Sequence, residues 1–328
     1  METGTVLEAK IAEAKNNCKS IVTITSDDGF YVSGIILAEL LEKYKLKASI
    51  SMPVCEAKKD WFRWMRLSRK SCLEIVNHSY THKVIPKDKE ISQEDFDHEI
   101  IDAKNFLHHR YKTDQIVFIP SNCALPSIET ERLIAKGIYA IRRAKRGINS
   151  LSPEEGEDGW MNMFTIGIGD VSTTDERNAF VDETIKMGGW LIEMWHCVSP
   201  NGDLCFQPIS TKDADAHLKY IHQNVIQGNV WITGYIEATK YIREKQNYKV
   251  KAQMCDGKIH CELQNVGRKL PIREFNDELT IILKVPSNWK NVCIYYKGKY
   301  KKVKMFADIN HNIVFNMRPS DKVTIEEG

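Results

Sequence analysis

The chain has 328 residues, of which 42% are hydrophobic and 27% are charged, and its formal net charge is +2. This composition is typical of a globular protein with a sizeable core, and the length predicts one large domain with a smaller one. No apolar run approaches the roughly 20 residues of a membrane-spanning helix, and the balanced charge gives no indication of nucleic acid as a partner.

The first residues and the cysteines bear on where the protein works. Residues 7–19 are rich in Ala, Glu and Lys and predict a polar helix, with no secretory signal. The chain has 9 cysteines, an odd number without a Cys-x-x-Cys pair, which favours mostly free thiols over a disulfide framework. Both features favour a reducing compartment such as the cytoplasm.

A short β-branched run at residues 20–25 predicts a buried strand, and Asp27, Asp28 and Gly29 follow where it ends. Folds of the α/β class place their chemistry at such strand ends. Because successive residues there point in different directions, the two carboxylates are expected to serve different purposes. One can bind a metal ion while the other stays free as a base.

A second apolar run is followed by His78 and His82. On a helical turn this spacing places both imidazoles on one face, within reach of one ion, and Asn77 or Ser79 can cap or orient the turn. Each pattern alone is more typical of an ordinary turn or a solvated helix face. Together, two imidazoles, one carboxylate and a free base predict a metal-dependent hydrolase.

Strands and helices alternate up to about residue 246. Helices are predicted at residues 34–44, 92–111 with Ser92 as N-cap, 127–136, 211–224 and from Thr174 or Asp175 to about 187; further strands are predicted at residues 47–52, 115–119, 138–142, 189–196 and 229–233. Repeated βα units predict a parallel sheet that closes into a barrel. The strand at 189–196 ends in His196, which adds a histidine to the same edge.

The pattern changes after residue 247. Alternating strand-like runs are separated by turn pairs such as Asp256-Gly257 and Lys297-Gly298, and no long helix is predicted. The expected domains are therefore a barrel at residues 1–247 and an antiparallel β-sandwich at residues 248–328. A packing or spacer role is favoured for the sandwich over glycan binding.

These motifs resemble those of the polysaccharide deacetylases with the NodB homology domain, carbohydrate esterase family 4. Residues 25–29 match the family's Thr-x-Asp-Asp-Gly motif, residues 78–82 match its His-Ser/Thr-x-x-His motif, and residues 194–196 are similar to its fifth motif, with Met in place of Leu. The resemblance covers about residues 19–246. Two departures are Ile119, which replaces the Arg before Pro in the third motif, and the fourth motif, stretched to Asp158-Gly159-Trp160.

The resemblance implies a distorted barrel of about seven strands and a set of roles. Asp28, His78 and His82 would bind the metal, Asp27 would be the general base and His196 the general acid. Supporting residues are also implied. A backbone N–H near Asn122 or Cys123 would stabilise an oxyanion, Asp158 would orient His196, and Arg142 or Arg143 can replace the missing Arg.

Substrate-side residues are implied as well. They are Pro120, Asn122, Trp160, Met194 and Trp195. A buried core position is the stronger alternative for Trp160 and for Trp195.

The predicted function is the removal of acetyl groups from a glycan, with the N-acetyl amide as first choice and the O-acetyl ester as second. The expected cofactor is one divalent metal ion, with zinc favoured and cobalt, nickel or manganese also compatible with the ligands. The substrate would be an acetylated oligo- or polysaccharide. The motif departures leave a glycan-binding protein without turnover as the alternative. Because the resemblance implies an exported enzyme, it conflicts with the cytoplasmic expectation, and the location stays open, as does the oligomeric state.

Overall fold

The computed structural model describes residues 5–86, 89–126, 128, 130–171, 173–201, 205–298 and 302–328. The chain divides into two compact units, one of residues 19–239 and the other of residues 240–328 with the described part of residues 1–18. This division differs from the boundary predicted at residue 247. The N-terminal segment belongs with the C-terminal residues, and the division falls within helix α9 (Tyr235–Asn247).

The described residues of the first unit contain seven parallel strands that form a closed barrel. They are β3 (Ser20–Ser26), β4 (Ala48–Met52), β5 (Leu73–Asn77), β6 (Val117–Phe118), β7 (Ala140–Arg146), β8 (Met163–Gly167) and β9 (Trp190–Trp195). The strands pair in this order, and β9 returns to pair with β3, which closes the barrel. Strand β12 (Val230–Ile232) pairs with the first residues of β3. The predicted barrel of about seven parallel strands is confirmed.

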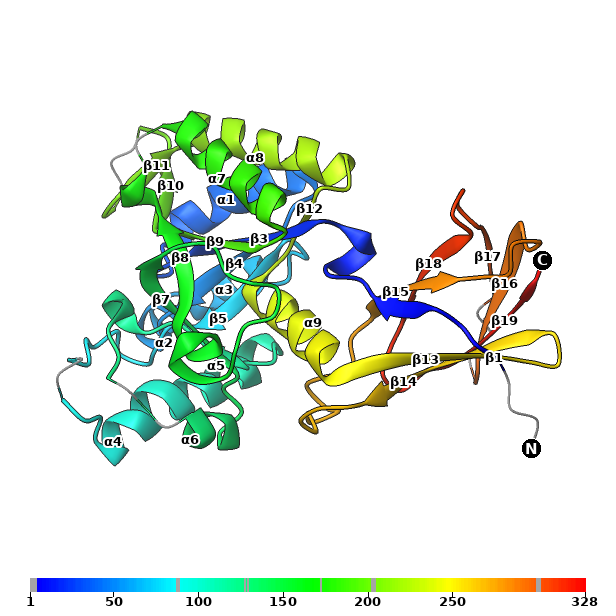
Figure 1. Cartoon of the computed structure of the whole chain (residues 1–328). Helices are drawn as coiled ribbons and strands as arrows, with labels where there is room; N and C mark the ends of the chain where they lie inside the picture. Colours follow the sequence, from blue (N-terminus) through cyan, green and yellow to red (C-terminus); the bar gives the residue numbers. More distant parts are fainter. Residues whose placement is uncertain are drawn as a thin grey trace. The chain divides into compact units, whose positions relative to one another are not determined.

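Helices cover the outside of the barrel (Figure 1). They are α1 (Tyr31–Tyr44), α2 (Val54–Lys59), α3 (Trp61–Leu67), α4 (Gln93–Asp95), α5 (Ala103–Tyr111), α6 (Thr130–Ala135), α7 (Thr174–Met187) and α8 (Thr211–Ile226). None of the helices in the described ranges combines the length and the apolar character that crossing a membrane requires.

Three predicted helix starts can be compared with the structure. Ser92 is an N-cap as predicted, since its Oγ accepts a hydrogen bond from the Asp95 N–H at 3.0 Å, and the helix continues through a π-helical segment, η2 (Phe96–Asp102), into α5. Helix α7 is capped one residue earlier than predicted, because Thr173 forms a reciprocal capping box with Glu176. Ser127, the predicted start of the helix at residues 127–136, lies outside the described residues.

The second unit is a β-sandwich of two antiparallel sheets. One sheet has the order β1 (Thr5–Val6), β13 (Tyr248–Cys255), β14 (Lys258–Asn265), β19 (Lys322–Glu327), β16 (Asn291–Tyr296) and β17 (Lys302–Phe306); the other has the order β18 (Asn312–Met317), β15 (Leu279–Lys284) and β2 (Ala9–Ile11). The helix predicted at residues 7–19 is wrong, because the N-terminal segment adds a short strand to each sheet. Pairing with β13 and β15 overrides the helical propensity of Ala, Glu and Lys.

Candidate active site

A cavity of about 310 Å³ lies where the barrel strands end. The predicted residues that line it are Asp27, Asp28, His78, His82, Asn122, Met194 and His196. It is also lined by Cys123, Ala144, Phe206 and Gln207, of which Cys123 was predicted only for its backbone N–H. Segments that are far apart in sequence therefore meet at one edge of the barrel, as the strand-end argument predicted.

The turn after β3 separates the two aspartates. Asp27 continues the strand and is 3% exposed, with its N–H donating to the Trp195 carbonyl at 2.8 Å. Asp28 has φ of 69° and Gly29 has φ of 63°, so the chain reverses in the left-handed region. A side chain on Gly29 would also meet Met52 Sδ at 2.8 Å. Both features favour glycine at position 29. The reversal at Asp28 ends the strand, so the two carboxylates point in different directions.

Three side chains converge as a possible metal-binding group. The ligand atoms of Asp28, His78 and His82 all lie within 4.8 Å of one another. Asp28 Oδ1 is 3.4 Å from His78 Nε2 and 3.1 Å from His82 Nε2. His78 Nδ1 donates to the Ile119 carbonyl at 2.7 Å, so Nε2 is the ring nitrogen that faces Asp28 and that can bind a metal ion once it is deprotonated. His82 Nε2 is buried without a well-aligned hydrogen bond in the described part of the chain. This donor set fits one divalent ion.

The electrostatics of the group are those of an ionised carboxylate between two imidazoles. Burial acts to raise the pKa of Asp28, but the hydrogen bonds and charges of His78 and His82 outweigh it and hold the pKa well below its usual range. The pKa of His82 is raised in turn, chiefly by its interaction with Asp28. A cation at this position would take the place of the imidazolium protons.

The predicted helical turn at residues 78–82 is wrong. These residues are not helical, and Ser79 and His82 have φ of 71° and 64°. Ser79 N–H donates to Asn77 Oδ1 at 3.0 Å, and His82 N–H donates to Ser79 Oγ at 3.1 Å. Such side-chain bonds compete with helix formation. Asn77 and Ser79 do orient the turn, as predicted, and they bring the two imidazoles together without a helix.

Glu99, on η2, also stabilises the turn at residues 78–82. It is 2% exposed, and its carboxylate accepts hydrogen bonds from Tyr80 N–H at 3.1 Å, Thr81 N–H at 3.0 Å and Thr81 Oγ1 at 2.7 Å. The sequence contains a signal for this residue, since Glu99 lies on the same helical stripe as the buried Phe96, Ile100 and Ala103. A charged residue on an apolar stripe needs partners, and here they are the backbone groups between the two histidines.

Substituting Glu99 by Gln is expected to loosen the metal-binding turn. Oε2 accepts both N–H groups and Oε1 accepts the Thr81 hydroxyl. An amide with its oxygen in the place of Oε2 removes the negative charge from these bonds and leaves the Thr81 hydroxyl without its acceptor, at about 1–3 kcal/mol of unfolding free energy. We expect metal affinity to fall about 10–100-fold, as is typical when a supporting partner is lost. Calorimetric titration with zinc measures this. Glu94→Gln, an exposed neighbour on α4, should leave affinity unchanged, and equal affinity of the two variants would contradict the assigned role of Glu99.

Asp27 is held by Arg142, from β7. Arg142 Nη2 donates to Asp27 Oδ2 at 2.6 Å, Nη1 donates to Thr25 Oγ1 at 3.3 Å, and both members of the pair are buried. Burial opposes the charged guanidinium, but the charge of Asp27 outweighs it, so the pKa of Arg142 is raised. Asp27 Oδ1 has no hydrogen-bond partner among the described residues. One carboxylate oxygen is thus fixed and the other is left to accept a proton.

Arg143 has a different position. Its side chain donates to the carbonyls of Leu125 at 2.6 Å and Met161 at 3.2 Å. Of the two arginines between which the sequence could not decide, only Arg142 contacts the aspartate.

His196 directly follows β9 and lines the same cavity as the metal-binding turn, from a segment more than 100 residues further along the chain. Its ring meets that of Phe206 edge to face, with centroids 5.2 Å apart, and Phe206 is 67% exposed. A disulfide between Cys197 and Cys205 links the residue after His196 to the residue before Phe206. The other seven cysteines are thiols, so the prediction of mostly free thiols agrees with the structure. No hydrogen-bond partner of His196 Nδ1 occurs within the described ranges.

Four predicted residues do not line the cavity. Asp158 is exposed, at the end of η4 (Gly156–Asp158), and it does not orient His196. Trp160 is fully buried against Trp190, with ring centroids 6.4 Å apart. Trp195 lies between the cavity-lining Met194 and His196 and therefore points to the opposite face of β9.

The fourth of these residues, Pro120, is buried, and its carbonyl accepts the Cys123 N–H at 2.9 Å. That bond uses the N–H of Cys123. Of the two positions predicted for an oxyanion contact, Asn122 therefore remains.

Comparison with solved structures identifies the fold of the barrel. A protein assigned as a polysaccharide deacetylase from Mycobacterium smegmatis has a TM-score of 0.54 at 13% identity, over 73% of this chain and 96% of that one. A carbohydrate esterase family 4 enzyme from Streptococcus mutans has a TM-score of 0.46 at 14% identity, over 66% of this chain and 86% of that one. A Bacillus anthracis family 4 pseudoenzyme, as a mutant with restored activity, has a TM-score of 0.44 at 16% identity, over 68% of each chain.

No family model matches the sequence, and no curated protein matches it. The likeness to the Mycobacterium smegmatis protein establishes that the chain contains the polysaccharide deacetylase fold, as the motifs predicted.

Proposed function

We propose that this protein is a metal-dependent hydrolase that removes acetyl groups from a glycan. The observation that carries the proposal is the convergence of Asp28, His78 and His82 beside a second carboxylate, Asp27, with one oxygen bound by Arg142 and the other unpartnered within the described chain. The three candidate metal ligands and the candidate base, Asp27, are therefore neighbours, but they are different residues.

The geometry supports separate roles for these residues. Asp28, His78 and His82 would hold a divalent ion. Such an ion would lower the pKa of a bound water molecule and polarise the carbonyl of the acetyl group. Asp27 Oδ1 accepts the proton of the attacking water, since Oδ2 is already engaged. His196, which also lines the cavity, donates a proton to the leaving nitrogen or oxygen. The backbone N–H of Asn122 is the remaining candidate for an oxyanion donor in the third motif.

The fold and the motifs together support an acetylated sugar as substrate. The likeness at a TM-score of 0.54 is to a protein assigned as a polysaccharide deacetylase. The N-acetyl amide is the first candidate and the O-acetyl ester the second, because the same tetrahedral chemistry serves both. Zinc is the favoured ion, and cobalt, nickel or manganese fit the same three ligands.

Chelation is expected to abolish activity and lower stability. Acetate release from N-acetylglucosamine oligomers and from acetylated xylan should fall to background with a chelator and return with zinc. At a metal concentration of about 100 times Kd, binding adds about 2.7 kcal/mol to the unfolding free energy. His82→Ala should remove both effects, whereas His109→Ala, an exposed histidine on α5, should remove neither. Acetate release that persists in the chelated protein would refute the metal-dependent reaction.

A glycan-binding protein without turnover is the second candidate. It is favoured by the exposed position of Asp158, which leaves His196 Nδ1 without a hydrogen-bond partner among the residues described. Metal binding and glycan affinity with no acetate release from either substrate would select it.

A further inference from the structure

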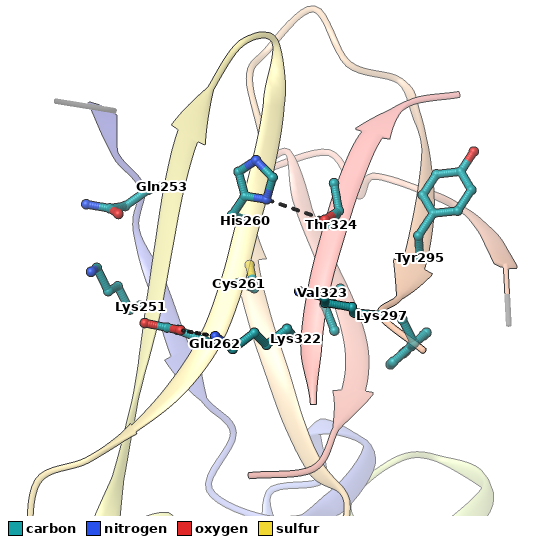
Figure 2. A pocket seen from close by; sticks show the side chains of 11 residues that line it. Lys251, Gln253, His260, Cys261, Glu262, Tyr295, Lys297, Lys322, Val323 and Thr324 are labelled. Atoms are coloured by element: carbon teal, nitrogen blue, oxygen red, sulfur yellow. Dashed lines mark hydrogen bonds and ion pairs between the residues drawn. The ribbon is translucent and has the colours of Figure 1, made fainter. Parts of the chain in front are cut away.

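The outer face of the six-stranded sheet in the sandwich unit contains a second cavity. Its volume is about 530 Å³, compared with about 310 Å³ at the barrel edge. Strands β13, β14, β16 and β19 supply most of its walls (Figure 2). Along β14, the outward His260 and Glu262 alternate with the buried Ile259, Cys261 and Leu263, so one face of the sheet packs in the core and the other is free.

The strand register arranges the outward side chains of this cavity in rows. The first row consists of Gln253, His260, Thr324 and Tyr295, since each residue is paired with the next across the sheet. Figure 2 shows this row, with a hydrogen bond of 3.4 Å between His260 Nδ1 and Thr324 Oγ1. It offers an amide, an imidazole, a hydroxyl and a phenol ring.

The second row consists of charged residues two positions along each strand. Lys251 is paired with Glu262, and Glu262 with Lys322, while the Lys297 N–H donates to the Lys322 carbonyl at 2.9 Å. The one ion pair in the row is loose, at 3.9 Å between Lys322 Nζ and Glu262 Oε2. In the described part of the chain, neither Lys251 nor Lys297 has an ion-pair partner. Three ammonium groups thus face one carboxylate.

The dimensions favour an elongated ligand. Four strands at a spacing of about 4.8 Å give rows about 14 Å long, and residues two apart along a strand place the rows about 7 Å from each other. Rows of this length extend far beyond a single small ion, and they match the length of a short oligosaccharide that lies across the strands.

The chemistry of the rows selects among elongated ligands. Sugar hydroxyls require both donors and acceptors, which the first row supplies. Lys302 Nζ lies over the Tyr295 ring, 5.3 Å from its centroid, and the second face of the ring can pack against a sugar. The excess of ammonium groups in the second row favours a ligand that carries anionic groups. A polyphosphate backbone fits less well, because Glu262 lies within the row and Glu326 is on the same face, paired with Lys258 at 2.7 Å.

We propose that this sheet face binds an acidic oligosaccharide, with its sugar rings along Gln253, His260 and Tyr295 and its carboxylates on the lysines. The choice of a sugar chain rests on the proposed function, whereas the rows and their charge do not. The face would hold a polymer independently of the barrel cavity.

Calorimetric titration of the full chain with hexuronic acid oligomers tests the proposal. We expect saturable binding that weakens with salt, and at least a 10-fold loss of affinity in the double variant Lys251→Gln/Lys322→Gln and in Tyr295→Thr. Lys249→Gln is the matched control, since Lys249 is exposed on the same face of β13 and does not line the cavity. Unchanged circular dichroism and unfolding midpoints establish that the variants fold.

The remaining outcomes separate this proposal from that of the barrel cavity. Loss of affinity in the variants, with no acetate release from any substrate, would refute the deacetylase and support the sheet-face site. Binding that is lost only in His82→Ala would place the ligand in the barrel and overturn the sheet-face site. Equal binding of neutral N-acetylglucosamine oligomers, preference for single-stranded DNA, or no binding at all would overturn it too.

Discussion

Asp27→Asn is expected to reduce acetate release by about 10²–10⁴-fold, the usual contribution of a positioned general base. Asparagine has nearly the same shape and can still accept the Arg142 hydrogen bond with its carbonyl oxygen, so the base is lost while the site keeps its geometry. Metal stoichiometry should stay at one ion per chain, because Asp27 is not among the converging ligands. Acetate release with saturating zinc, together with elemental analysis, measures both quantities.

Asp28→Asn is the matched comparison for this prediction. It changes the adjacent carboxylate in the same way, but it removes a ligand, so both metal content and activity should fall. If Asp27→Asn instead lost the metal and Asp28→Asn kept it, the two aspartates would have exchanged roles. Full activity of Asp27→Asn would leave the proposed reaction without its base.

The parts of the site that the sequence predicted are those determined by neighbouring residues. The β-branched run of β3 and the following Asp-Asp-Gly specify a buried strand and a turn, because Gly29 allows a positive φ that few residues adopt. Strand ends in a parallel barrel share one edge, so His78 and His196 could be expected near Asp28 without knowledge of the strand order. Alternation along β9 places Trp195 on the face opposite Met194 and His196, in agreement with the buried core position that was the stronger alternative for it.

The parts that could not be predicted depend on choices between distant segments. Arg142 and Arg143 are adjacent, and a shift of one residue in the register of β7 would exchange their faces. The i, i+4 spacing of His78 and His82 is compatible with a helix, but the bonds of Asn77 and Ser79, together with those of Glu99, stabilise a non-helical turn. The N-terminal residues have helical propensity, but the free edges of two sheets determine their conformation.

Removal of the ion pair between Arg142 and Asp27 is expected to reduce both stability and activity strongly. Arg142→Gln leaves the buried Asp27 without its counter-charge, which typically lowers the unfolding free energy by about 3–5 kcal/mol. Because Asp27 Oδ2 loses the donor that holds the base in position, we expect acetate release to fall by at least about 100-fold. Denaturant unfolding and acetate assays well below the unfolding temperature measure the two effects.

The double variant Asp27→Asn/Arg142→Gln separates stability from catalysis. Removing both charges eliminates the unpaired carboxylate, so most of the lost unfolding free energy should return while activity stays at the level of Asp27→Asn. Arg143→Gln is the control on the same strand. It loses hydrogen bonds to two carbonyls, so it should be less stable by about 1–3 kcal/mol and remain catalytically active. Because the same substitution is made at adjacent positions, a loss of activity confined to Arg143→Gln would transfer the support of the base from Arg142 to its neighbour.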